Sequence, residues 1–201
     1  MDKKKILVLG NSPQINRIDF SRLDPSVETL GVNRIFLAHI PTYFFFHDIE
    51  IARELEVQPQ YLDPLKERSK IFSSEWLTRE KKRIPDWTKV YFRSHLQKSY
   101  FPDSVTTAIR LLSDNIIDHT KYVFYIAGVS LTWNNPSHFW KELNYTSLNR
   151  GDAVWYNPRF AKIVDNFRYL KNINYNLVSV TPNSQLNKFI RQESIENLYI
   201  S

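Results

Sequence analysis

Cysteine is absent from this sequence of 201 residues. The absence excludes disulfide bonds, thiolate zinc sites, iron–sulfur clusters and a cysteine nucleophile. No stretch approaches the roughly 18 to 20 consecutive apolar residues that a transmembrane helix needs. The first apolar run covers only Ile6 to Leu9, which is too short for a secretory signal, so we expect a cytoplasmic protein.

Glycine is scarce. The sequence contains 4 glycines, whereas average usage would give about 14 in a chain of this length. Gly10 ends the apolar run Ile6 to Leu9, Gly31 lies in the run that ends at Val32, and Gly128 ends the run Tyr122 to Ala127. Glycines in these places indicate strand ends at which the backbone closely approaches another group.

Short apolar runs alternate with helical patterns along the chain. The predicted strands are Ile6 to Leu9, Val27 to Val32, Tyr43 to Phe46, Lys70 to Phe72, Val90 to Phe92, Tyr122 to Ala127 and Leu177 to Val180. The predicted helices are Val105 to Ile116 after Asp103 or Ser104, Phe160 to Leu170 with Pro158 in the first turn, and Leu186 to Ile190 after Asn183 or Ser184. This alternation predicts an α/β fold: a Rossmann-like, mostly parallel open sheet with helices on both faces.

We expect residues 1–201 to form a single domain, since no composition change or repeat divides the chain. One stretch, about 130–157, is rich in Asn, Trp and Tyr and lacks a regular pattern. A segment of that length in a compact domain is usually a binding loop, so we interpret it as lid-like.

The familiar phosphate-binding motifs are also missing. The segment Gly10-Asn11-Ser12-Pro13 has one glycine and no following Lys-Ser/Thr, so it is neither a dinucleotide fingerprint nor a P-loop. Its polar groups at the start of a helix could hold a phosphate, or the segment could be an ordinary helix cap. There is no Asp-x-Asp motif; Asp48-Ile49-Glu50 is the nearest imitation, and we predict no metal site and no bound cofactor.

Six short segments follow one another in a specific order. They are Gly10-Asn11-Ser12-Pro13, Ile18 to Leu23, Val32-Asn33-Arg34, Tyr91 to His95, Ile126 to Ser130 and Thr181 to Ile190. Their order and spacing resemble the bacterial CMP-sialic-acid transferases, a family of sialyltransferase-like glycosyltransferases. In that family Gly-Asn-Gly-Pro precedes Ile-Asp-Tyr-Ser-Arg-Leu, and Cys-Pro-Asn-Ser-x-Leu-x-x-Phe-Ile closes the domain.

The resemblance implies a cytidine nucleotide bound across the strand ends without a metal, and we expect the co-substrate to be a nucleotide sugar of CMP or UDP type. Transferred one by one, the nucleotide-binding positions are Gly10, Asn11, Ser12, Asn33, Ser104, Gly128 and Val129. Helix N-termini would stabilise the phosphate in place of a metal ion.

Several positions depart from the family pattern. Ser12 replaces the second glycine, Ser130 replaces an aspartate, and the family's catalytic histidine falls on Tyr156 or Asn157. These departures favour a changed donor or acceptor over sialyl transfer itself. The alternatives are a sialyltransferase-like enzyme acting on a cell-surface glycan, or an inactive nucleotide-binding protein.

Sugar transfer needs a general base beside the acceptor hydroxyl. His47 with Asp48 follows a predicted strand, and His138 lies in the lid-like stretch, so these three are the candidate catalytic residues. His39 and His119 are interpreted as structural.

Positive charge is concentrated in one segment. Residues 66–98 hold ten basic and four acidic residues, which equals the whole net charge of +6. With its interleaved aromatic residues, this segment could bind DNA through Lys81, Lys82, Arg83 and Arg93, or could simply be a solvated surface.

Taken together, the motifs, the resemblance and the charge lead to our main hypothesis. The protein is a metal-independent glycosyltransferase, with a hydroxymethylated base in phage DNA as one candidate acceptor.

Overall fold

The computed structural model describes residues 3–75, 84–92, 103–131, 138–139 and 153–200. Within these ranges eight strands form one sheet, and every neighbouring pair is parallel. The strands are β1 (Lys4–Leu9), β2 (Glu28–Val32), β3 (Tyr43–Phe46), β4 (Lys70–Ser74), β5 (Lys89–Tyr91), β6 (Tyr122–Ala127), β7 (Leu177–Ser179) and β8 (Arg191–Gln192). The predicted Rossmann-like α/β domain is confirmed.

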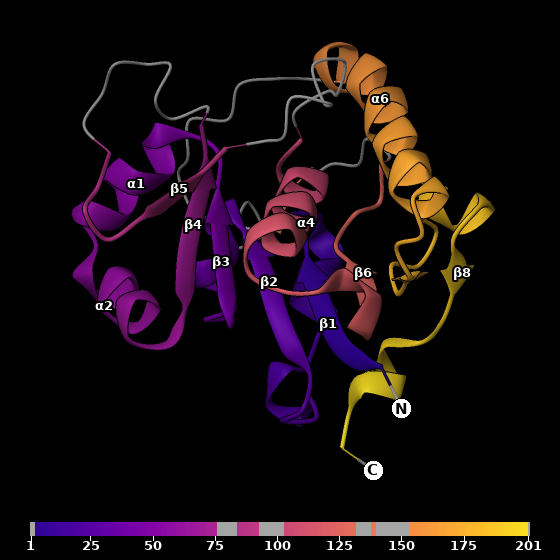
Figure 1. The fold of residues 1–201 in the computed structure, drawn as a ribbon, viewed down its shortest axis with the longest axis horizontal. Helices are drawn as coiled ribbons and strands as arrows, with labels where there is room; N and C mark the ends of the chain where they lie inside the picture. The colour runs from indigo at the N-terminus through magenta and orange to yellow at the C-terminus, as the bar shows by residue number, and fades with distance from the viewer. Residues whose placement is uncertain (1–2, 76–83, 93–102, 132–137, 140–152, 201) are drawn as a thin grey trace.

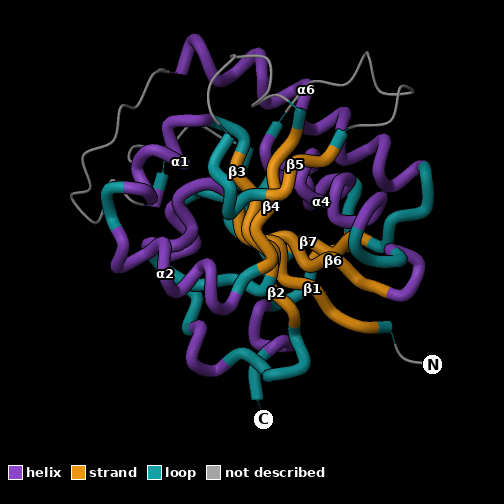
Figure 2. The backbone as a smooth tube through the Cα atoms, turned by 60° about the vertical axis from the view of Figure 1, so that its left-hand side comes forward, coloured by secondary structure: helices purple, strands orange, loops and turns teal. Residues whose placement is uncertain are grey.

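Helices cover both faces of the sheet (Figures 1 and 2). The α-helices of the described ranges are α1 (Ile49–Glu56), α2 (Pro59–Arg68), α4 (Ser104–Asn115) and α6 (Ala153–Asn172). The 3₁₀ helices are η1 (Pro13–Arg17), η2 (Phe20–Arg22), η3 (Asn33–Leu37), η5 (His119–Lys121), η6 (Gln185–Lys188) and η7 (Ile195–Leu198). Helices α4 and α6 pack on one face, and η1, η3, α1 and α2 pack on the other.

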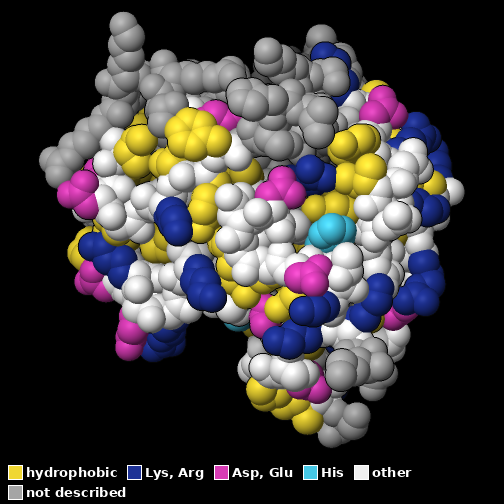
Figure 3. Space-filling model, viewed as in Figure 1, with side chains coloured by type: hydrophobic (Ala, Val, Ile, Leu, Met, Phe, Trp, Pro, Cys, Tyr) yellow, Lys and Arg dark blue, Asp and Glu magenta, His cyan; other side chains and the backbone are white. Residues whose placement is uncertain are grey.

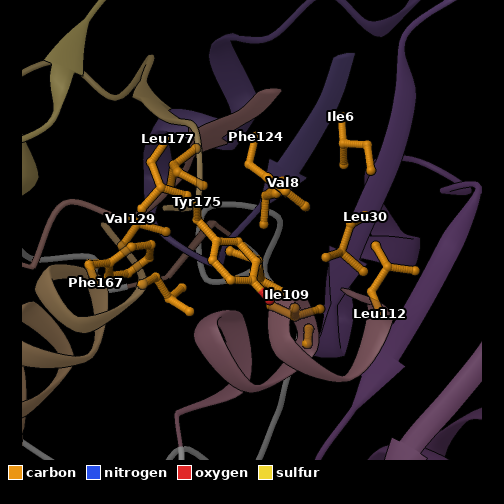
Figure 4. Packing of buried hydrophobic residues seen from close by; sticks show 14 of the residues in the cluster. Ile6, Val8, Leu30, Ile109, Leu112, Phe124, Val129, Phe167, Tyr175 and Leu177 are labelled. Carbon is orange, nitrogen blue, oxygen red and sulfur yellow. The ribbon is translucent and has the colours of Figure 1, made fainter. Parts of the chain in front are cut away.

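The central strands are buried on both faces, which explains their uninterrupted apolar runs. Along β1, Ile6 and Val8 face the α4 side, whereas Leu7 and Leu9 face the η1 side, and all four are fully buried. Figure 4 shows the α4-side core, where strand residues meet Ile109 and Leu112 of α4 and Phe167 of α6.

The strand order is β5-β4-β3-β2-β1-β6-β7-β8. The chain therefore builds the sheet outward from β1 to β5, and then crosses to the other side of β1 to add β6. The order in which strands are added reverses between β1 and β6, so the connections that follow these two strands lie on the two sides of this reversal point. In open α/β sheets ligands bind outside the carboxyl ends of the strands at such a point.

All seven predicted strands are present, with ends that differ by at most two residues. Strand β8 was not predicted, because Arg191 and Gln192 are two exposed polar residues at the sheet edge and carry no apolar signal. Helices α1 and α2 were also not predicted.

The predicted helices are found with different bounds. Helix α4 begins after Asp103, whose Oδ1 accepts a hydrogen bond from the Thr106 amide at 2.9 Å, as predicted for an N-cap. Placing Pro158 in the first turn of its helix is wrong, because α6 begins at Ala153. Packing of its buried apolar side chains, not the proline, holds that helix. The helix predicted after Ser184 is the single 3₁₀ turn η6.

Among the described residues, none of the helices is both long enough and apolar enough to cross a bilayer.

The contacts of His39 support its interpretation as a structural residue. Its ring stacks on Phe20 with centroids 4.5 Å apart, and its Nε2 lies 3.2 Å from Thr29 Oγ1. Burial lowers the pKa of His39 below its usual value of 6.5, because charging the ring there loses hydration.

This lowered pKa predicts a pH-dependent stability. Below about pH 6.5 the unfolded chain binds a proton at His39 that the folded protein resists, so the free energy of unfolding falls as the pH drops. We expect the His39→Gln variant to lose less stability than the wild type between pH 7.5 and pH 5. Urea unfolding at both pH values measures this, and equal losses would contradict the prediction.

Candidate functional site

The chain segments that leave β1 and β6 touch at the reversal point. The Gly10 amide donates to the Ala127 carbonyl at 2.8 Å, and the Ser12 amide donates to the Gly128 carbonyl at 2.9 Å. A Cβ atom on Gly10 would lie 2.4 Å from the Gly128 carbonyl oxygen. We call this contact the glycine crossing.

Gly128 has a φ of +67°, and a Cβ on it would lie 2.5 Å from Ile15 Cδ1. Both glycines are therefore needed for steric reasons. The backbone amides of Gly10 and Ser12 already donate hydrogen bonds to carbonyls of the protein. The phosphate contact expected from this segment would therefore have to be made by its side chains. The Ser12 hydroxyl itself bonds Gln14 Oε1.

Asn33 joins three elements on the α4 side of the sheet. Its Nδ2 donates to Ser104 Oγ, the first residue of α4, at 3.1 Å, and its Oδ1 accepts from the His47 amide after β3 at 3.4 Å. Asn33 has a φ of 53°, a left-handed conformation that asparagine tolerates better than most residues. Three residues predicted from separate parts of the sequence therefore lie together, and Asn33 and Ser104 are partly exposed.

A buried polar cluster supports the start of α4. Asp103 Oδ2 accepts from Asn166 Nδ2 of α6 at 2.6 Å and also from the Thr106 hydroxyl. Burial raises the pKa of the Asp103 carboxyl, and hydrogen bonds from Thr106 and Asn166 act against that rise. The cluster fixes the position of Ser104 relative to α6. It was not anticipated from the sequence, because Asn166 is 63 residues away.

Asn11 contacts Phe139, which belongs to the stretch predicted to be lid-like. Its carbonyl accepts from the Phe139 amide at 3.1 Å, and Asn16 Nδ2 donates to the Phe139 carbonyl at 3.2 Å. Phe139 is fully buried in the η1-side core. These bonds hold the neighbouring His138 near the end of β1. The Asn11 Oδ1 atom is buried and lacks a hydrogen-bond partner among the described residues.

The two residues of the predicted pair, His47 and Asp48, differ in burial. The His47 side chain is buried and lies against Phe45, with ring centroids 5.9 Å apart, whereas Asp48 and Glu50 are exposed. In the described ranges no group of three His, Asp or Glu residues could hold a metal ion.

The segment after β7 braces the end of β6. Thr181 Oγ1 accepts from the Val129 amide at 3.3 Å, Ser184 Oγ donates to the Val129 carbonyl at 2.5 Å, and Gln185 Nε2 donates to the Leu131 carbonyl at 2.6 Å. Val129 therefore uses both of its backbone polar groups within the protein. The resemblance pointed to this segment, but the sequence did not reveal its bracing role.

Left-handed backbone conformations gather at the same edge. Beyond Asn33 and Gly128, a positive φ occurs at Leu131 after β6 and at Asn183 after β7, whereas the remaining one in the described ranges, at Asn174, lies before β7. Such conformations cost free energy and are often found at functional sites.

The DNA-binding candidates Lys81, Lys82, Arg83 and Arg93 lie outside the described residues. So do the side chains of Tyr156 and Asn157, on which the family's histidine would fall. On the face shown in Figure 3, the described Lys and Arg side chains are interspersed with Asp and Glu and form no single patch.

The glycine crossing predicts a specific sensitivity. We expect Gly10→Ala to lower the free energy of unfolding by about 1–3 kcal/mol, because the added carbon must displace backbone. Ser26→Ala, at an exposed position, should change it by less than about 0.5 kcal/mol. Urea unfolding measures both values, and equal effects would contradict the steric account.

Comparison with known proteins gives one kind of match. No family model and no curated protein matches the sequence. Among solved structures, the sialyltransferase CstII from Campylobacter jejuni in complex with cytidine-5'-monophosphate aligns with a TM-score of 0.60 at 13% identity, over 100% of this chain and 88% of that chain.

Two further structures agree. The sialyltransferase CST-II in complex with a trisaccharide acceptor and CMP aligns with a TM-score of 0.58 at 15% identity, over 98% of this chain and 89% of that chain. The monofunctional α-2,3-sialyltransferase Cst-I from Campylobacter jejuni aligns with a TM-score of 0.58 at 15% identity, over 99% of this chain and 83% of that chain. Along its whole length, this chain is similar in fold to these bacterial sialyltransferases.

Proposed function

We propose that this protein is a sialyltransferase-like glycosyltransferase that uses a CMP-linked sugar and a glycan acceptor. The observation that carries the proposal is the full-length similarity in fold to enzymes whose structures hold CMP and, in one case, a trisaccharide acceptor. A DNA acceptor remains a prediction from the basic segment, and the comparisons favour the glycan alternative.

The donor site would lie at the carboxyl ends of β1, β2 and β6. Asn33 and Ser104 form a hydrogen-bonded pair with partly exposed side chains, suited to contact a ribose or phosphate. Asn11 adds a buried amide oxygen that lacks a partner within the described ranges, and a bound nucleotide could supply the missing donor. Gly10 and Gly128 contribute by keeping the segments that carry Asn11 and Val129 in contact at this edge.

The reaction forms one bond and breaks one. The acceptor hydroxyl oxygen attacks the anomeric carbon, the bond from that carbon to the phosphate oxygen breaks, and CMP leaves with the electron pair. The hydroxyl proton passes to a general base. His138 is our first candidate because Phe139, its neighbour, is bonded to Asn11; buried His47, with exposed Asp48 beside it, is the second.

A nucleotide titration tests the donor site. Wild-type protein should bind CMP more tightly than UMP, and CMP at 100 times its dissociation constant should add about 2.7 kcal/mol of stability in a thermal-shift assay. Ser104→Ala should weaken CMP binding by up to about tenfold, because it removes a hydroxyl beside the nucleotide.

Ser113→Ala is the matched control, since Ser113 lies near the opposite end of α4 and bonds the Ile109 carbonyl. Its CMP affinity should equal that of the wild type. The absence of CMP binding by the wild type would refute the proposal, and CMP binding without sugar transfer would support the inactive alternative.

Chelation tests how the phosphate is stabilised. The positive end of the α4 dipole, together with the Asn33 amide and the Ser104 hydroxyl, can stabilise the leaving phosphate without a metal. We therefore expect CMP release from a CMP-sugar to continue unchanged in EDTA. A loss of turnover that manganese restores would instead direct attention to Asp48 and Glu50.

A further inference from the structure

A cavity of about 510 Å³ opens on the η1 side of the sheet. Its walls come from η1 and the following residue, the end of β6, the segment after β7, and residues 192–196, which begin with the last residue of β8. This volume falls in the range of roughly 300–1,000 Å³ that is common for small-molecule sites.

The cavity is separate from the proposed donor site. Of the residues assigned to the nucleotide, only Gly128 lines it. In the cavity wall, Val180 belongs to the η1-side core and Ile195 packs against that core. Ser104, in contrast, begins α4, which packs in the α4-side core. The glycine crossing lies between the two regions.

The lining has no surplus of positive charge. Arg17 is the cation among its described residues, and Glu193 and Glu196 are the anions. Glu193 also pairs with Arg191 at 2.7 Å, so the charges around the cavity are balanced. Such a site does not favour a polyphosphate or a nucleic acid, which need excess cations.

The uncharged part of the lining combines two kinds of surface. Ile18, Val180 and Ile195 are apolar, while Gln14 and Ser194 offer hydrogen-bonding groups. A sugar ring presents the same combination, since its hydroxyls donate and accept hydrogen bonds and its C–H face is apolar.

Part of the lining, including Glu193, is held in place before any ligand binds. The Glu193 amide donates to the Ser179 carbonyl at 3.0 Å, and Asn197 Nδ2 donates to Glu193 Oε2 at 3.3 Å. On the opposite wall, the Ile18 amide donates to the Ile15 carbonyl at 3.1 Å. A fixed site loses little conformational entropy on binding.

We propose that this cavity binds a neutral sugar unit of the acceptor glycan, distant from the hydroxyl that reacts. The inference rests on the proposed transfer to a glycan and adds where, and through which residues, the acceptor chain is held. Glu193 and Glu196 accept hydrogen bonds from sugar hydroxyls, and the apolar wall packs against the ring.

The test titrates the full chain with four neutral disaccharides, lactose, cellobiose, maltose and chitobiose, followed by backbone amide NMR. At least one should shift the amides of residues 192–196. Glu196→Gln should weaken that binding by about tenfold, because a charged hydrogen-bond acceptor is replaced by a neutral one.

Ser194→Trp should abolish the shifts by filling the cavity; Ser194 is exposed and its side chain makes no capping hydrogen bond. Gln60→Trp, at an exposed position on α2, is the matched control and should bind sugar as the wild type does.

A parallel CMP titration separates the two proposals. CMP binding with no disaccharide response, or a response that Ser194→Trp leaves intact, overturns the sugar cavity and leaves the donor proposal standing. Disaccharide binding at residues 192–196 without CMP binding overturns the donor proposal and leaves a carbohydrate site.

Discussion

The glycine crossing is the contact on which the functional edge depends. Parallel strands β1 and β6 run side by side along their whole length, so the segments that leave them start at the same place and must diverge. They do so at a separation that leaves no room for a Cβ on Gly10. On one side of this contact lie Asn33 and Ser104, and on the other lies the cavity lined by Arg17 and Glu193.

Much of this arrangement could be predicted because it has a local cause. Buried parallel strands are apolar on both faces, so runs such as Tyr43–Phe46 and Tyr122–Ala127 stand out in the sequence. In a chain this poor in glycine, Gly10 and Gly128 mark the strand ends. Asp103 before an apolar periodic pattern indicates a helix start, and the structure has one there.

The features that could not be predicted depend on contacts between distant residues. Asn166 reaches Asp103 across 63 positions, and Ser184 reaches Val129 across 55. Nothing local in either polar residue identifies its partner. The cavity has the same origin, since two of its walls, η1 and residues 192–196, lie at opposite ends of the chain. A resemblance to a family can point to such segments without revealing what they contact.

The position of β1 at the centre of the sheet has a consequence for folding during synthesis. Strands β2 to β5 can join β1 in the order in which the ribosome releases them, but the other edge of β1 pairs with β6, where Lys4 lies opposite Tyr122. Until that distant strand emerges, the unpaired edge of a strand whose last four residues are apolar is open to other chains, which is a recognised route to aggregation. The pairing of β1 with β6 also joins residues that are far apart in the sequence, and contacts of this kind form slowly. The nascent protein therefore passes through a stage in which five of the eight strands can be paired while one edge of β1 is still unprotected.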